Sequence, residues 1–99
     1  MVEICIYETV HGKFQFTVFL DSIRNVTDRA RILTRLDRVE SGNFGDYKSL
    51  GDGLFELRFF FGSGYRVYFG MNGNQWVLLL CGGNKGSRDK DILMARRYW

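Results

Sequence analysis

The sequence predicts an α+β fold, in which two N-terminal helices pack on one face of a curved, mainly antiparallel sheet and a short C-terminal helix follows. The main observation is the stretch 55–69, FELRFFFGSGYRVYF, in which aromatic and β-branched residues fill two arms around a Gly-Ser-Gly turn. Upstream of it, two segments carry apolar residues at helical spacing. The 99 residues suit one compact domain, residues 1–99, and are too few for two.

The N-terminal part predicts a strand and then a helix. Residues 1–7 (MVEICIY) alternate loosely between apolar and polar side chains, which indicates a first strand. Residues 14–24 fit a helix, because four apolar residues recur at i, i+3, i+4 and i+7. These four are Phe16, Phe19, Leu20 and Ile23.

A second helix is predicted over 28–41, with Thr27 as its N-cap and Gly42 at its end. We expect its apolar residues to face inward, namely Ala30, Ile32, Leu33, Leu36 and Val39. We expect its arginines to face mainly outward, namely Arg29, Arg31, Arg35 and Arg38. The simpler interpretation of this arginine-rich side is a solvated helix face, and the alternative is a flank that contacts phosphates.

Three further strands are predicted after this helix, in addition to a short edge strand at 46–50. Gly64 suits the positive φ of a three-residue loop, which pairs Phe61 with Tyr65 and Arg58 with Tyr68. Alternation then gives the central hairpin a core face with seven residues, Phe55, Leu57, Phe59, Phe61, Tyr65, Val67 and Phe69. The opposite face carries Glu56, Arg58, Phe60, Arg66 and Tyr68.

The apolar run 76–81 (WVLLLC) predicts a central strand, joined to the hairpin by a type I′ turn at Asn72-Gly73. Pairing around this turn places Tyr68 opposite Val77 and Arg66 opposite Leu79. The arginine-bearing face would then be a groove with a basic rim and an apolar floor made of Phe60, Val77 and Leu79. A last helix is expected after Ser87, with Ile92, Ala95 and Trp99 inward.

Composition narrows the function only modestly. The net charge of +3 is compatible with nucleic-acid binding without indicating it. We find no apolar run that would span a bilayer and no signal peptide, so we expect a cytoplasmic protein without membrane contact. Cys5 and Cys81 lie in apolar strand-like stretches and are expected to be buried, reduced thiols. The lone His11 favours neither a catalytic triad nor a metal site, and no metal or other cofactor is expected.

One group of side chains indicates a site for an anionic ligand. Arg58, Arg66 and Tyr68 share a sheet face, and Lys48 and Lys85 can approach them from flanking segments. Guanidinium and ammonium groups hold phosphates well. Together they would stabilise charge on a phosphodiester during attack by an RNA 2′-hydroxyl, without a metal. The sequence therefore predicts an anion-binding surface, and less directly a nuclease site.

The motifs ELR (56–58), GYRVYF (64–69), LLLCGG (78–83) and Lys85, followed by a short helix with Asp91-Ile92, resemble the RelE/ParE toxin superfamily. The likeness is nearest to the HigB-like "addiction module killer protein" branch of type II toxin–antitoxin systems, and it covers nearly the whole chain. It implies a small RelE-like toxin, monomeric when free, that a cognate antitoxin neutralises. Members of the RelE and HigB kind cleave mRNA on the translating ribosome.

By position, the resemblance assigns catalytic roles to Arg66, Arg58 and Lys85. From their charge or their place near this face, RNA-binding roles are predicted for Lys48, Tyr68 and Arg88. The groove floor of Phe60, Val77 and Leu79 is the expected antitoxin contact.

Two positions depart from the RelE pattern, which has a lysine where this chain has Glu56 and a catalytic tyrosine near Ile92. Glu56 would be either a general base or an ion-pair partner of Arg58 or Arg66. These departures leave two other functions open, a ParE-like gyrase inhibitor without catalysis and a degenerate, non-toxic interaction module.

Overall fold

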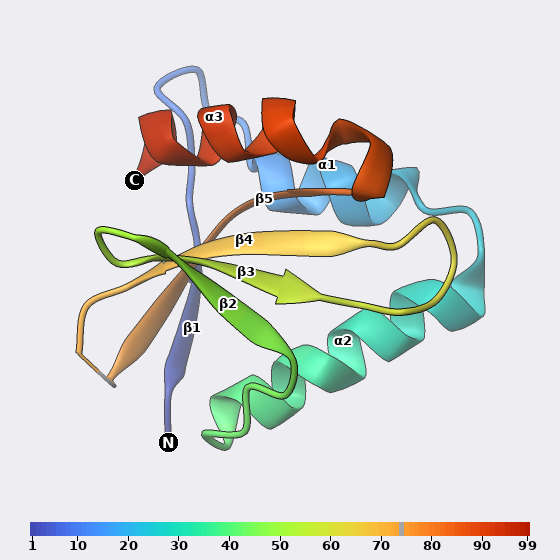
Figure 1. The fold of residues 1–99 in the computed structure, drawn as a ribbon, viewed down its shortest axis with the longest axis horizontal. Coiled ribbons are helices and arrows are strands. Elements are labelled where there is room, and N and C mark those ends of the chain that lie inside the picture. Colours follow the sequence, from blue (N-terminus) through green and yellow to red (C-terminus); the bar gives the residue numbers. More distant parts are fainter. Residues whose placement is uncertain (74) are drawn as a thin grey trace.

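A computed structural model of the chain describes residues 1–73 and 75–99 and confirms the α+β class (Figure 1). The elements are β1 (Glu3–Ile6), α1 (Gln15–Ser22), α2 (Val26–Glu40), β2 (Tyr47–Gly51), β3 (Leu54–Arg58), β4 (Arg66–Met71), β5 (Trp76–Gly83), a 3₁₀ turn (Lys85–Ser87) and α3 (Arg88–Tyr98). Five strands form one sheet in the order β1-β5-β4-β3-β2. The sheet is mixed, because β1 runs parallel to β5 and the other neighbours are antiparallel. Helices α1 and α2 lie between β1 and β2 in the chain, so they precede four of the five strands.

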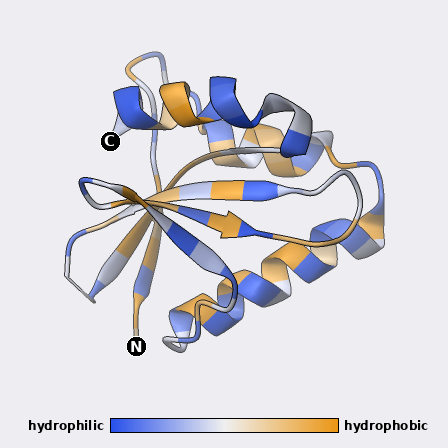
Figure 2. Ribbon diagram, in the orientation of Figure 1, coloured by the Kyte–Doolittle hydropathy of each residue, from blue (hydrophilic) through white to orange (hydrophobic). Residues whose placement is uncertain are grey.

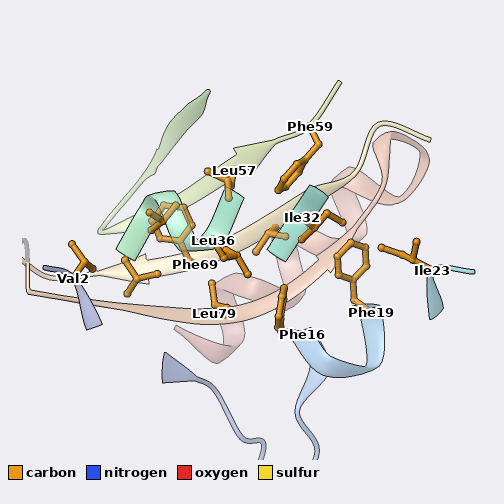
Figure 3. Packing of buried hydrophobic residues seen from close by; sticks show 13 residues of the cluster. Val2, Phe16, Phe19, Ile23, Ile32, Leu36, Leu57, Phe59, Phe69 and Leu79 are labelled. Atoms are coloured by element: carbon orange, nitrogen blue, oxygen red, sulfur yellow. The ribbon is translucent and has the colours of Figure 1, made fainter. Parts of the chain in front are cut away.

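Both faces of the sheet are covered by helices. Apolar residues of α1 and α2 form one core with β3, β4 and β5, and Figure 3 shows Phe16, Ile32, Phe69 and Leu79 meeting there. Helix α3 packs on the other face through Ala95, in a second and smaller core. Figure 2 shows the corresponding pattern, with hydrophobic residues along the strands and hydrophilic ones alternating along α2.

Helix α2 begins earlier than the sequence predicts. Asn25, not Thr27, is the N-cap, and its side-chain oxygen accepts a hydrogen bond from the amide of Asp28 at 3.0 Å. Gly42 follows the helix with φ 93°, as predicted. Three of the predicted inward residues are buried, Ile32, Leu36 and Val39. The other two predictions are wrong, because Ala30 is exposed and Leu33 is 46% exposed.

The central hairpin has the predicted faces but a different register. Arg58 pairs with Arg66 rather than with Tyr68, because the turn is longer and Phe59 donates its amide to the carbonyl of Tyr65 at 3.0 Å. The change amounts to two residues. An even shift leaves every side chain on the same side of the sheet, so the predicted core face is confirmed.

The second hairpin register is also different. Tyr68 pairs with Cys81 and Arg66 with Gly83, and the register shifts between Tyr68 and Phe69. The turn predicted at Asn72-Gly73 runs into residue 74, so its type lies outside the described residues.

The predicted groove floor does not exist as one surface. Val77 is 0% and Leu79 2% exposed, and both lie in the core beneath α1 and α2. Phe60 is 84% exposed. Val77 and Leu79 therefore cannot meet an antitoxin beside Phe60, which corrects that prediction.

Within residues 1–73 and 75–99, no helix is both long and apolar enough to cross a membrane. The same residues contain no cluster of three or more His, Cys, Asp or Glu side chains suited to a metal ion.

Candidate functional site

The predicted basic residues meet at one end of the sheet, on the side that α3 covers. Two adjacent rows of cross-strand neighbours bring them together. One row runs through Lys48, Glu56, Tyr68 and Cys81, and the next through Arg58, Arg66 and Gly83. We call Lys48, Arg58, Arg66, Lys85 and Arg88 the basic cluster.

Glu56 lies at the centre of the cluster and is 0% exposed. Arg88 donates to both of its carboxylate oxygens, from Nε to Oε2 at 2.8 Å and from Nη2 to Oε1 at 3.3 Å. Arg66 Nε lies 3.3 Å from the same Oε2. The hydrogen bond to Glu56 raises the pKa of Arg88. Glu56 is therefore an ion-pair partner of Arg66, as one alternative predicted, and also of Arg88.

Arg58 lies beside Arg66 but is bound to a carboxylate of its own. Its Nε is 3.2 Å from Oδ2 of Asp46, and the two side chains are 36% and 34% exposed. A pair this open to solvent contributes roughly 0–1 kcal/mol to stability. Asp46 was not expected here, since the sequence predicted it as the first residue of the edge strand, whereas the structure places it just before β2. Arg58 thus has a carboxylate to itself, whereas Arg66 and Arg88 share the single carboxylate of Glu56.

Tyr68 supports the cluster from below and cannot touch RNA. It is 0% exposed within the core under α3, which overturns its predicted RNA-binding role. Among the residues that the structure describes, its hydroxyl has no hydrogen-bond partner of normal geometry. Burial first, and then the negative charge of Glu56, raise its pKa well above the ordinary range.

Lys85 is held close to Arg66 by the turn after β5. Asn84 accepts hydrogen bonds from the amides of Gly86 and Ser87 at 2.8 and 3.1 Å, in a capping box of the 3₁₀ turn. Ser87 is the N-cap residue of α3, as predicted, but its side chain makes no cap hydrogen bond. The Lys85 amide also lies 3.4 Å from the carbonyl oxygen of Ser63 in the central hairpin loop. An open depression of about 580 Å³ results, and its lining is Arg66, Lys85, Gly86, Ser87, Arg88, Asp89 and Lys90.

Lys48 belongs to the same face but not to the depression. It is exposed on β2, in register with Glu56. The structure thus brings Arg66, Lys85 and Arg88 together at one depression and leaves Lys48 and Arg58 along its β2–β3 flank.

Arg35 is the functional side chain that the sequence pattern misplaced. It was predicted to face outward, yet its guanidinium donates to the carbonyl oxygens of Phe44, Asp46 and Arg58 at distances from 2.7 to 3.3 Å. Burial lowers its pKa. The sequence did hold a signal for this position. Arg35 comes three residues after the buried Ile32 and directly before the buried Leu36, so it lies at the border of the buried side of α2. Arg35 fastens the end of β3, and hence Arg58, to α2.

The buried thiol of Cys81 and the buried phenol of Tyr68 on this face predict a loss of stability at alkaline pH. Burial, and then the charge of Asp91, raise the pKa of Cys81 to about 12, and the pKa of Tyr68 is raised as well. The unfolded chain therefore loses these protons first, and the free energy of unfolding should fall above about pH 9, by about 1.4 kcal/mol per pH unit for each group. Urea denaturation across this range measures the fall. Tyr68→Phe should make it shallower above about pH 10, and an unchanged slope would contradict the assignment.

Comparison with known proteins gives one informative match. A Haemophilus influenzae protein described as "Uncharacterized protein" is 47% identical over 81 residues, which are 82% of this chain and 82% of that protein. No family model matches the chain.

Proposed function

The chain belongs to one family with the uncharacterized Haemophilus influenzae protein, and we propose that it is the toxin of a type II toxin–antitoxin system, a ribosome-dependent mRNA endonuclease that needs no metal. One observation carries the proposal. Arg66, Lys85 and Arg88 line a single open depression while a buried carboxylate fixes two of them from behind. The order of elements, strand, two helices, four strands and a helix, suits a small α+β toxin and supports the proposal beside the resemblance of the motifs.

The charges of the depression suit a phosphodiester. Glu56 balances one of the two guanidinium groups it binds, so Arg66 and Arg88 together keep a net positive charge. Lys85 adds a further exposed ammonium group. Donors fixed in place before the reaction stabilise the negative charge that develops on phosphate when the 2′-hydroxyl attacks. Lys48 and Arg58 would hold the strand on the β2–β3 flank of the depression.

A cognate antitoxin is the second part of the proposal. Such a partner would neutralise the toxin by covering the depression with carboxylates, which compete for the donors that hold phosphate. The ribosome and its mRNA are the proposed target, since the depression is open to a strand presented by a larger assembly.

A cell-free translation reaction with a defined reporter mRNA tests the proposal, with the 5′ ends of the products mapped. Wild-type protein should cut at codon-phased positions and only on translating ribosomes. Arg66→Ala should lower the cleavage rate by about 10²–10³, the loss typical for removing a transition-state donor. Lys85→Gln should also lower it, and because Lys85 is exposed its loss cannot be ascribed to misfolding.

Arg97→Gln is the matched control, because it removes one exposed positive charge from the far end of α3. Equal rates for all variants would contradict the assignment of the depression. Intact mRNA together with inhibited DNA supercoiling by purified gyrase would replace the nuclease with the gyrase alternative, and tolerance of strong expression without antitoxin would favour an inactive module.

A further inference from the structure

A second basic surface lies on the other side of the β3 end. Helix α2 and the segment 59–61 enclose a groove of about 400 Å³, which we call the α2 groove. Its lining consists of Arg31, Thr34, Arg35, Arg38, Phe59, Phe60 and Phe61. No carboxylate belongs to this lining, which therefore carries only positive charge among its described residues.

Two of the three arginines are available to a ligand. Arg35 is committed to backbone carbonyl oxygens, as described above. Arg31 and Arg38 are exposed, and none of the ion pairs between described residues includes either of them. They are seven residues apart on α2, so their positions differ by about 10 Å along the helix axis. Such a distance accommodates more than one anionic group.

The aromatic residues of the groove are covered by guanidinium groups. The guanidinium carbon of Arg31 lies 3.8 Å from the ring centroid of Phe61, and that of Arg35 lies 5.0 Å from the ring centroid of Phe59. A guanidinium stacked on a ring keeps its N–H edge free for a phosphate. Phe60 is the exception, with 84% of its surface exposed.

This arrangement distinguishes between two polyanionic occupants. An acidic amphipathic helix needs an apolar floor for its own apolar stripe, and here the guanidinium groups occupy that floor. A single strand of RNA needs a positively charged track and a flat ring on which an unpaired base stacks. We propose that the α2 groove is a binding subsite for single-stranded RNA, with phosphates on Arg31 and Arg38 and a base on Phe60.

The subsite rests on the proposed function, because it extends the strand held at the depression beside Arg66. The two surfaces adjoin at the end of β3, where Arg35 Nη1 donates to the carbonyl oxygen of Arg58 at 2.8 Å. Phe60 follows Arg58 after a single residue and projects into solvent. A strand leaving the depression past Arg58 therefore meets Phe60 and then the two free arginines.

Fluorescence anisotropy with a labelled oligouridylate of roughly 12 nucleotides tests the subsite, since single-strand sites of this kind span about 4–16 nucleotides. Phe60→Ala should weaken binding on the order of tenfold. Phe60→Leu should weaken it nearly as much, because leucine keeps the apolar character and loses the ring. The double variant Arg31→Gln/Arg38→Gln should weaken binding and lower the slope of log affinity against log salt by about 1.4, or about 0.7 for each lost phosphate contact.

The double variant Arg96→Gln/Arg97→Gln supplies the charge-matched control on α3, and both arginines there are exposed. Equal losses in the two double variants, or wild-type binding by Phe60→Leu, would overturn the subsite. Binding of poly-glutamate that depends on Arg31 and Arg38, with RNA binding unchanged, would assign the groove to an acidic protein partner instead.

The same variants separate this inference from the proposed nuclease. If groove variants lose RNA affinity while wild-type protein cuts no mRNA on ribosomes, the subsite stands and the nuclease assignment fails. If cleavage depends on Arg66 and Lys85 while groove variants bind and cut like wild type, the nuclease stands and the subsite is wrong.

Discussion

Replacing Glu56 with alanine should destabilise the protein by about 3–5 kcal/mol, the loss typical when one partner of a buried ion pair is removed. Glu56 is fully buried between two guanidinium groups, and the side chain of Arg66 is only 15% exposed. Without the carboxylate, Arg66 keeps its charge in a poorly solvated place. Arg88, with 32% of its side chain exposed, can turn toward water more easily. Equilibrium urea denaturation measures the change.

Two further variants sharpen this prediction. Glu56→Gln keeps the volume and one acceptor oxygen, so its loss should fall between those of wild type and Glu56→Ala. In a double-mutant cycle with Arg88→Ala, the loss from Glu56→Ala should shrink, because the hydrogen bonds to Arg88 are then already gone. A Glu56→Ala protein as stable as wild type would show that the pair contributes nothing. The prediction also concerns function, because Glu56 holds Arg66 and Arg88 in position at the depression.

For the central hairpin, the sequence predicted which face of the sheet each residue occupies but not which residues pair. For β5 it predicted the wrong face, because Val77 pairs with Met71 instead of Tyr68, and this odd shift of three residues turns its side chain to the other side. Alternation with a period of two determines the face of Leu57 or Val67 whatever the length of the turn. Register depends on how many residues the turn takes up, and a glycine-rich turn permits several lengths. A shift of two residues changed the partner of Arg58 from Tyr68 to Arg66. Because this shift leaves every apolar side chain on its own face, the hydrophobic pattern gave no sign of it.

The misplaced residues of the candidate site share a different cause. Arg35 was expected outside because it is charged, but the backbone carbonyl oxygens of Phe44, Asp46 and Arg58 need donors where the chain leaves regular structure. Tyr68 was expected at the surface because the face that α3 covers cannot be known from the hairpin alone. Such tertiary contacts have no local sequence pattern, whereas the approach of Lys85 to Arg66 was predicted because chain order keeps β4 and the turn after β5 adjacent.

Gly83→Ala should destabilise the protein by about 1–3 kcal/mol, the typical loss when a methyl group is forced into a filled space. A Cβ built on Gly83 would collide with the carboxylate of Asp91 and lie 2.7 Å from Oγ of Ser87. Both atoms belong to the start of α3 and its preceding turn, which are held by the Asn84 capping box. Gly86→Ala is the matched control, because its Cβ meets only Asn84 Oδ1, at 3.2 Å, and its loss should stay below about 1 kcal/mol.

The same prediction extends to the other face through Gly82. A Cβ there would collide with the ring of Phe19 on α1, so Gly82→Ala should also destabilise, and Phe19→Leu should offset part of its loss by removing the ring. No such rescue is expected for Gly83→Ala, because its obstacle is on α3. Gly83 is also the register partner of Arg66. Because Arg88 is the first residue of α3, pushing α3 away from Gly83 would also separate Arg88 from Glu56. A folded Gly83→Ala protein that cuts mRNA like wild type would show that the depression does not depend on this close contact.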